Sequence, residues 1–294
     1  MSEVIRSSIR QILIPNKRPD KYFGVDFFAS FLHGSDPSYQ FFSSLIDPIQ
    51  TFQEEPVEEK QDALEVFSRE IAHLNRGTII GFPANPDPYA IPNGLMKQAL
   101  ERCRVLELGV LIETSSLEIL HDLPQIQKLA EVAPVVVVVP IAFTRDPLTT
   151  VFETEQRTTF AQRIKLVHAL REANILCGIV MKPIIPFVND SVETLQEVID
   201  KAVQVHASFV YPNFVLSFTE DQRRRFLSLI DKQFPVLRNL YMDKFGSKRT
   251  WATPNQSALK KEFVFSVKKH HMPYGMNEIV ALIQPVSTTQ YSLF

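Results

Sequence analysis

Residues 132–143 read VAPVVVVVPIAF. The run is apolar almost throughout and lacks the alternation of a half-exposed strand, so it predicts a parallel strand buried on both faces. It is too short and too proline-rich to cross a bilayer. Together with five other apolar, β-rich runs it gives six predicted strands, at 27–33, 78–82, 108–113, 135–143, 175–181 and 209–218.

Amphipathic helical stretches lie between these strands. The clearest is SVETLQEVIDKAVQVH at 191–206, because it follows Asn189 and Asp190 and places its apolar residues on one face. Six β/α units in succession predict an α/β fold, a partial (β/α)6 TIM-like barrel of parallel strands. The helices predicted between the strands are 58–75, 94–104, 124–132, 155–173 and 191–206.

A chain of 294 residues is long enough for one large α/β domain with additions at its ends. We expect residues 1–26 to form an N-terminal extension, 27–218 the barrel, and 219–294 a helical C-terminal extension packed on the barrel. The acidic, proline-containing segment 46–60 predicts an exposed connection. The helices predicted in the C-terminal extension are 220–233, 234–245 and 254–270.

The composition is that of an ordinary globular protein, with 45% hydrophobic residues, 22% charged residues and a net charge of −2. The start, MSEVIRSSIRQ, lacks the apolar core of a secretory signal, so we expect a cytoplasmic protein with no membrane partner. The two cysteines, Cys103 and Cys177, make neither a disulfide framework nor a metal-site spacing. We expect both to be buried, inert thiols.

Ligands of parallel α/β sheets lie at the carboxyl ends of the strands, so the loops there are the candidate site. The loop after 78–82 holds Asp87 between two prolines, followed by Tyr89. Asp87 can accept hydrogen bonds from an ammonium group or backbone amides, or it can cap the helix near Gly94. After 108–113, Ser115 can face a ligand, or Ser115 or Ser116 can act as an ordinary N-cap.

The remaining strand ends carry further polar residues. Arg163, on the helix after the fourth strand, either reaches into the open end of the sheet or is a solvated side chain. The run PIIPFVND, which contains Asn189, forces an extended exit from the fifth strand. Tyr211 and Asn213 on the sixth strand lie at the level expected for a substrate.

These segments resemble radical S-adenosylmethionine (SAM) proteins of the spore photoproduct lyase type. GVDFFASFLHG is similar to the run that leads into the family's C-x3-C-x2-C loop, PDPY to its SDPY or TDPY segment, and PIIPFVND to its P-x-x-P-x-x-N-D segment. The resemblance extends from SSIRQIL near the start to Met276. It implies a SAM pocket with two residues facing the substrate, Tyr211 and Asn213, and five binding the cofactor, Asp87, Tyr89, Ser115, Arg163 and Asn189.

The sequence departs from this family where the family's chemistry begins. Three thiolates of the C-x3-C-x2-C loop hold a 4Fe–4S cluster in these proteins, and the cluster binds and cleaves SAM. Here Ser35 stands at the first cysteine position, and the rest of the loop is deleted. Glu113 replaces the usual lysine of the ribose-facing motif, adding negative charge, and VVVVVPIAF replaces a more polar strand. The 4Fe–4S ligands are therefore absent, and we expect no cofactor, with only weak or vestigial SAM binding.

We therefore expect a degenerate member of the family that acts as a non-catalytic binding or partner protein, for example beside a cysteine-bearing radical SAM paralogue. The alternative is an enzyme, either of the same family or of another class reusing the barrel mouth through Asp87, Glu113 and Tyr211, with nucleic acid as one substrate class. Basic residues are concentrated at 223–271. They predict a nucleic-acid surface or simply solvated helix faces, and the residues chosen for that surface are Arg223, Arg224, Lys248 and Arg249.

Overall fold

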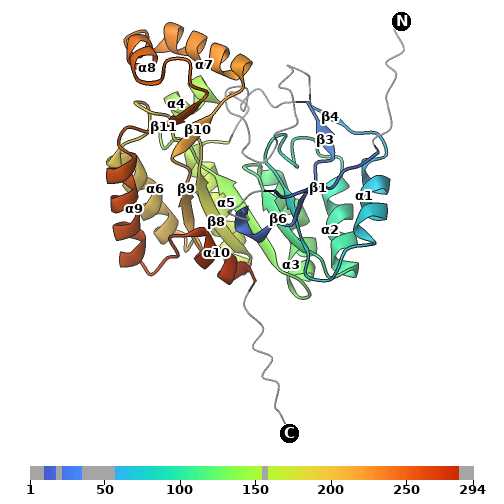
Figure 1. Ribbon diagram of the computed structural model, residues 1–294. Coiled ribbons are helices and arrows are strands. Elements are labelled where there is room, and N and C mark those ends of the chain that lie inside the picture. The colour runs from blue at the N-terminus through green and yellow to red at the C-terminus, as the bar shows by residue number, and fades with distance from the viewer. Residues whose placement is uncertain (1–9, 18–21, 35–56, 154–157, 285–294) are drawn as a thin grey trace, which may run out of the picture.

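The computed structural model describes residues 10–17, 22–34, 57–153 and 158–284 (Figure 1). Within these ranges the main sheet has the strand order β1-β2-β5-β6-β7-β8-β9. In this sheet β2, β5, β6, β7, β8 and β9 run parallel in that order, and β1 adds an antiparallel edge. This confirms the predicted α/β fold with a partial barrel of six parallel strands. The strands are β1 (Ile14–Pro15), β2 (Phe27–Phe28), β5 (Ile79–Phe82), β6 (Gly109–Glu113), β7 (Val135–Pro140), β8 (Leu176–Met181) and β9 (Val210–Pro212).

Helices flank the sheet along its length (Figure 1). All five predicted helices are present with somewhat different ends, and the structure adds the short helices η3 and α4. Some of the helices start at polar caps, as at Ser191, whose hydroxyl accepts a hydrogen bond from the amide of Thr194. The helices are α1 (Ala63–Ile71), α2 (Leu95–Val105), η3 (Leu117–Asp122), α3 (Leu123–Ala130), α4 (Asp146–Phe152), α5 (Phe160–Glu172) and α6 (Val192–Gln204).

Two predicted strands are wrong in extent, because each divides between two sheets. Beyond β2, the run 27–33 continues into β3 (Leu32–His33), which pairs with β4 (Glu58–Glu59). The helix predicted at 58–75 therefore begins only at Ala63.

The run 209–218 divides in the same way. After β9 the side chain of Asn213 accepts a hydrogen bond from the amide of Val215, at 3.2 Å, and this turn starts β10 (Val215–Ser217). Strand β10 pairs antiparallel with β11 (Thr250–Ala252), away from the main sheet.

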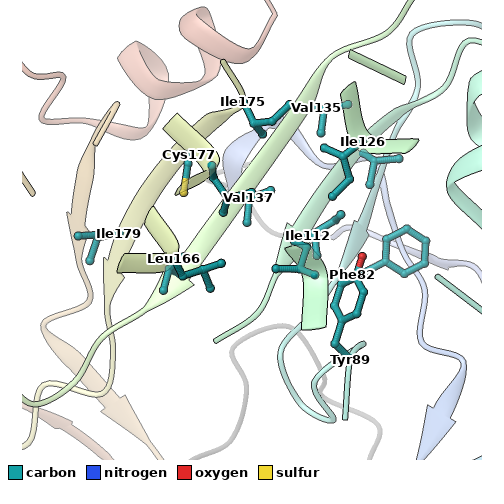
Figure 2. Close-up of a cluster of buried hydrophobic side chains, with 14 of the residues drawn as sticks. Phe82, Tyr89, Ile112, Ile126, Val135, Val137, Leu166, Ile175, Cys177 and Ile179 are labelled. Carbon is teal, nitrogen blue, oxygen red and sulfur yellow. The ribbon is translucent and has the colours of Figure 1, made fainter. Parts of the chain in front are cut away.

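Both faces of the parallel sheet are buried, as the continuous apolar strands predict. The outward face packs against the helices; Figure 2 shows Ile112, Val137 and Cys177 from the strands beside Ile126 of α3 and Leu166 of α5. The inward face packs against η1 (Tyr22–Gly24) and α10 (Met276–Ile283), which come from opposite ends of the chain. The buried residues of this face include Phe28, Ile79, Leu111, Val136, Val138 and Val180 on the strands and Phe209 just before β9.

The C-terminal part contains α7 (Glu220–Gln233), α8 (Leu237–Phe245) and α9 (Gln256–Lys269). Their bounds match the prediction closely, whereas α10 was not predicted. Phe226, Tyr241 and Trp251 form the centre of a second apolar core, so Trp251 is packed and does not face a ligand. In the described ranges, none of the helices has both the length and the apolar character that a membrane span requires.

Candidate functional site

Asp87 joins the loops that follow β5 and β6. It is buried, and its carboxylate accepts hydrogen bonds from the amide of Tyr89 at 2.9 Å, the hydroxyl of Thr114 at 2.7 Å and the amide of Ser115 at 3.1 Å. It does not cap α2, which starts after Gly94 without a side-chain cap. Of the two alternatives, the structure therefore shows Asp87 as an acceptor for backbone amides.

Tyr89 points away from this carboxylate toward Asp122, a residue that sequence reasoning missed. The Tyr89 hydroxyl donates to Asp122 Oδ2 at 3.3 Å. Burial raises the pKa of Tyr89 far above its usual range, so the phenol remains a proton donor. Burial also raises the pKa of Asp122, while the hydrogen bond from Tyr89 acts in the opposite direction. The pair fixes the β5 loop against η3.

Arg163 reaches under the open end of the sheet, and the solvated alternative is wrong. Its guanidinium donates to the carbonyl of Pro140 at 3.0 Å, the last residue of β7, and to the carbonyl of Thr158 at 3.1 Å. It also forms a buried ion pair with Glu153, which the sequence did not single out. Thr158 in turn donates to the carbonyl of Ser115 at 2.9 Å. Each nitrogen of the guanidinium thus has a partner inside the chain.

Asn189 connects the loops after β7 and β8. Its Oδ1 accepts a hydrogen bond from the amide of Ile185 at 2.5 Å. Its Nδ2 donates to the carbonyl of Ala142 at 2.7 Å and to that of Pro183 at 3.0 Å. Asp190 beside it accepts from Thr253, which ties this loop to the C-terminal part of the chain.

Glu113 lies on the inward face at the end of β6 and is completely buried. The hydroxyl of Tyr22 donates to Glu113 Oε2 at 3.0 Å, and Nζ of Lys182 forms an ion pair with Oε1. Nζ also lies 3.4 Å from the Tyr22 hydroxyl oxygen. The negative charge expected at Glu113 is therefore compensated by Lys182. The rule that chemistry follows strand ends could have identified Lys182, which directly follows β8, but no local signal identifies Tyr22.

The two residues predicted to face the substrate differ in position. Tyr211 is half-buried, and its ring meets the edge of Phe23 inside the barrel, with 5.6 Å between ring centroids. Asn213 makes the turn from β9 to β10 described above, and its amide donates to the carbonyl of Met181 at 3.0 Å. The side-chain oxygen of Asn213 thus accepts a hydrogen bond from the backbone of its own turn.

The predicted nucleic-acid surface needs correction. Arg223 is only 9% exposed and its guanidinium donates to the carbonyl of Gly246, so it belongs to the packing of α7 against α8. Arg224 is exposed but forms an ion pair with Asp221. Lys248 and Arg249 are exposed at the start of β11. Arg223 is therefore not available to such a surface, whereas a role of Arg224, Lys248 and Arg249 in binding nucleic acid stays a prediction.

A more uniform basic surface lies on α9. We call it the α9 surface, and it consists of four exposed lysines of this helix together with Phe265, whose side chain is 67% exposed. Nζ of Lys268 lies 4.7 Å from the ring centroid of Tyr274. Within the described ranges these lysines form no ion pair with a carboxylate. They are Lys260, Lys261, Lys268 and Lys269.

The residues of this chain do not fit an iron–sulfur cluster. Ser35 and the segment after it lie outside the described residues. The whole sequence contains two cysteines, one too few for three thiolates. Cys103 lies on α2 and Cys177 on the outward face of β8, and burial raises the pKa of each thiol to about 12. In the described part of the chain, no group of three or more His, Cys, Asp or Glu residues is placed to hold a metal.

No family model and no curated protein matches the sequence. Solved structures do match. A cysteine-to-serine mutant of spore photoproduct lyase aligns with a TM-score of 0.60 and 14% identity over 95% of this chain and 78% of that chain. The lyase complexed with dinucleoside spore photoproduct aligns with a TM-score of 0.58 and 14% identity, over 95% of this chain and 79% of that chain. A double mutant of the lyase with bound AdoMet and dinucleoside spore photoproduct aligns with a TM-score of 0.55 and 15% identity, over 92% of this chain and 78% of that chain.

The chain therefore has the partial-barrel fold of radical SAM proteins. Among the solved structures, spore photoproduct lyase shares this fold over nearly the whole of the present chain. At this level of identity the likeness concerns the fold.

Proposed function

We propose that this protein is a spore photoproduct lyase-like member of the radical SAM fold that has lost its cluster ligands and acts by binding. The cysteine inventory carries the proposal: the chain has two cysteines, and both are buried thiols with raised pKa values, on α2 and β8. A 4Fe–4S cluster held by thiolates needs more sulfur ligands than this, placed together. Without a cluster the chain has no electron source for cleaving SAM.

The contacts of the predicted SAM residues support weak or vestigial SAM binding. The side chains of Asp87, Arg163 and Asn189 hold the strand-end loops together through hydrogen bonds within the chain. A ligand there competes with these bonds, and each new hydrogen bond contributes only about 0.5–1.5 kcal/mol. A handful of such bonds corresponds to a dissociation constant of about a millimolar.

Anaerobic reconstitution with iron and sulfide tests the loss of the cluster, with a cysteine-bearing spore photoproduct lyase treated in parallel as the positive control. We expect the lyase to become brown and to retain iron, and this protein to elute without iron. A brown product with stoichiometric iron would contradict the proposal. A thermal shift series with SAM tests the pocket, because a ligand at 100 times its Kd stabilises the folded state by about 2.7 kcal/mol.

For the binding partner we propose single-stranded nucleic acid on the α9 surface. Exposed lysines without carboxylate partners suit phosphates, and an exposed aromatic ring beside them suits stacking on a base. Alanine replacement of Lys261 and Lys268 should weaken binding in a gel shift at low salt at least tenfold. Arg224→Ala, which removes an exposed but already ion-paired cation, is the matched control and should leave binding unchanged.

Absence of retardation by the unmodified protein at low salt would eliminate nucleic acid as the partner. The proposed partner would then be a protein, and co-purification with a cysteine-bearing radical SAM paralogue would test it. The iron measurement is independent of both experiments, so failure of the partner proposal and failure of the cluster proposal are distinguishable.

A further inference from the structure

The cluster of Tyr22, Glu113 and Lys182 is the strongest concentration of ionisable groups on the inward face of the barrel. The residues two positions before Glu113 and Lys182 on the same face are Leu111 and Val180, and both are fully buried. The three polar side chains therefore lie beside buried apolar residues, where electrostatic interactions and hydrogen bonds are stronger than in water.

The members of the cluster differ in access to solvent. The side chain of Lys182 keeps 16% of its surface exposed, whereas that of Glu113 keeps 1%. Tyr22 is also buried. The side chain of Lys182 is therefore the part of the cluster most open to solvent, while the carboxylate of Glu113 and the phenol of Tyr22 are buried.

The charges of the cluster indicate which kind of ligand fits. The ammonium of Lys182 is already paired with Glu113, so the cluster offers no excess positive charge to an anion. What remains is the nitrogen as a nucleophile, with a carboxylate beside it that can accept a proton and a phenol that can donate a hydrogen bond. This is the set of groups that amine–carbonyl chemistry uses.

We propose that Lys182 binds a small aldehyde or ketone covalently and reversibly, by forming an imine. The Lys182 ammonium transfers a proton to Glu113, and the free amine adds to the carbonyl carbon. As the carbon–oxygen double bond opens, the oxygen takes one proton from the adding nitrogen and becomes a hydroxyl group. This hydroxyl group then takes up the proton held by Glu113 and leaves as water while the carbon–nitrogen double bond forms.

The step is balanced without any other reactant. An ammonium and a carbonyl compound give a protonated imine and one water, and no electrons are gained or lost. The protonated imine carries one positive charge, as the ammonium does, so Glu113 keeps a cationic partner in both states. The Tyr22 hydroxyl lies 3.0 Å from Glu113 Oε2, to which it donates, and 3.4 Å from Nζ. Once Glu113 holds the transferred proton, this hydroxyl can turn its one hydrogen from Glu113 to the departing oxygen. This inference is independent of the missing cluster and goes beyond the proposed partner.

Reductive trapping tests the proposal on the full chain. The folded protein is incubated with limiting glyoxylate or propanal and cyanoborohydride, which reduces an imine to a stable secondary amine, and the modified lysines are located by peptide mass spectrometry. We expect Lys182 to be labelled at least tenfold faster than Lys260, which is exposed on α9. The two probes show whether the ligand carries a carboxylate. Equal or slower labelling of Lys182 with both probes would show that the cluster is a structural ion pair only and would overturn the proposal.

Two variants separate the chemistry from general reactivity. Lys182→Arg keeps the positive charge beside Glu113 but cannot form an imine, so the fast-labelled site should disappear. Tyr22→Phe keeps the ring in the apolar packing and removes only the hydroxyl, and it should slow labelling of Lys182 severalfold without changing that of Lys260. Unchanged labelling of Lys182 in Tyr22→Phe would exclude the phenol from the step. Should either variant fail to fold, the rates in the unmodified protein still decide the proposal.

Discussion

Arg163 and Glu153 form an ion pair beneath the carboxyl end of β7, with side chains only 4% and 10% exposed. Removing one partner of a buried pair leaves the other charge desolvated, which costs about 3–5 kcal/mol. We therefore expect Arg163→Ala to lower the free energy of unfolding by about that amount in urea denaturation. The carbonyl of Pro140 also loses a donor.

Arg224→Ala is the matched control, because Arg224 also pairs with a nearby carboxylate, that of Asp221, but its side chain is 70% exposed. An exposed pair contributes about 0–1 kcal/mol, so this variant should be nearly as stable as the unmodified protein. Equal losses in the two variants would mean that the Arg163 pair is not buried as described.

The contacts of Arg163 also show what the sequence could and could not predict. Its position at the open end of the sheet follows from the order of strands and helices, and the order follows from apolar periodicity. Its partner Glu153 precedes the helix predicted at 155–173, and Thr158 falls inside that prediction but ahead of α5, which begins at Phe160. No local pattern identifies either residue as a partner of Arg163. Similarly, Glu113 and Lys182 lie on strands separated by β7, and only the curl of the sheet brings their side chains together.

Local sequence signals, such as capping residues, predicted the bounds of a helix where those bounds depend on that helix alone. The helix at 220–233 was predicted with the same bounds as α7, and in the structure Thr219 and Gln222 form a capping box at its start. The turn at Asn213 was missed because an apolar run continues on both sides of it, and apolar character alone does not reveal a change of sheet.

Gly178 on β8 is the position where an added methyl group should be least tolerated. A Cβ there would overlap the ring of Phe209, which is buried and stacked on Phe23 at 5.4 Å between centroids. Overpacking of this kind costs about 1–3 kcal/mol, so Gly178→Ala should lower the free energy of unfolding by about that amount.

Gly275→Ala is the control for this substitution, because an added Cβ there meets no atom within 4 Å and the backbone φ is negative. It should change stability little. The double variant Gly178→Ala, Phe209→Leu should recover part of the loss, since the two side chains compete for one space. Strict additivity of the two effects would argue against the overlap.

The two thiols should be unreactive in the folded protein. Burial raises the pKa of Cys103 and Cys177 to about 12, and only the thiolate reacts with alkylating agents. Iodoacetamide at neutral pH should therefore modify both residues only after unfolding in urea, as read by intact mass. Rapid alkylation of either cysteine in the folded state would show an accessible thiolate and would weaken the argument that the chain lacks cluster ligands.

Asp122 should make stability depend on pH in a direction opposite to that of an ion-paired carboxylate. Burial raises its pKa in the folded state above the usual value of 3.8, so the folded protein holds this proton to higher pH than the unfolded chain does. The contribution of Asp122 to stability is therefore complete below that usual value and is lost as pH rises through the folded-state pKa. The difference in unfolding free energy between the unmodified protein and Asp122→Asn should accordingly fall from about pH 3.5 towards neutrality.

Tyr89→Phe tests the cause of this dependence. The hydrogen bond from Tyr89 lowers the pKa of Asp122, against the effect of burial. Removing this hydrogen bond should raise the pKa of Asp122 further. The difference in unfolding free energy caused by Asp122→Asn should then decline over a range that extends to higher pH. We would measure urea unfolding of Tyr89→Phe with and without Asp122→Asn across the same pH series. A difference that does not vary with pH in either background would show that Asp122 titrates equally in the folded and unfolded states, and that its burial has no electrostatic consequence.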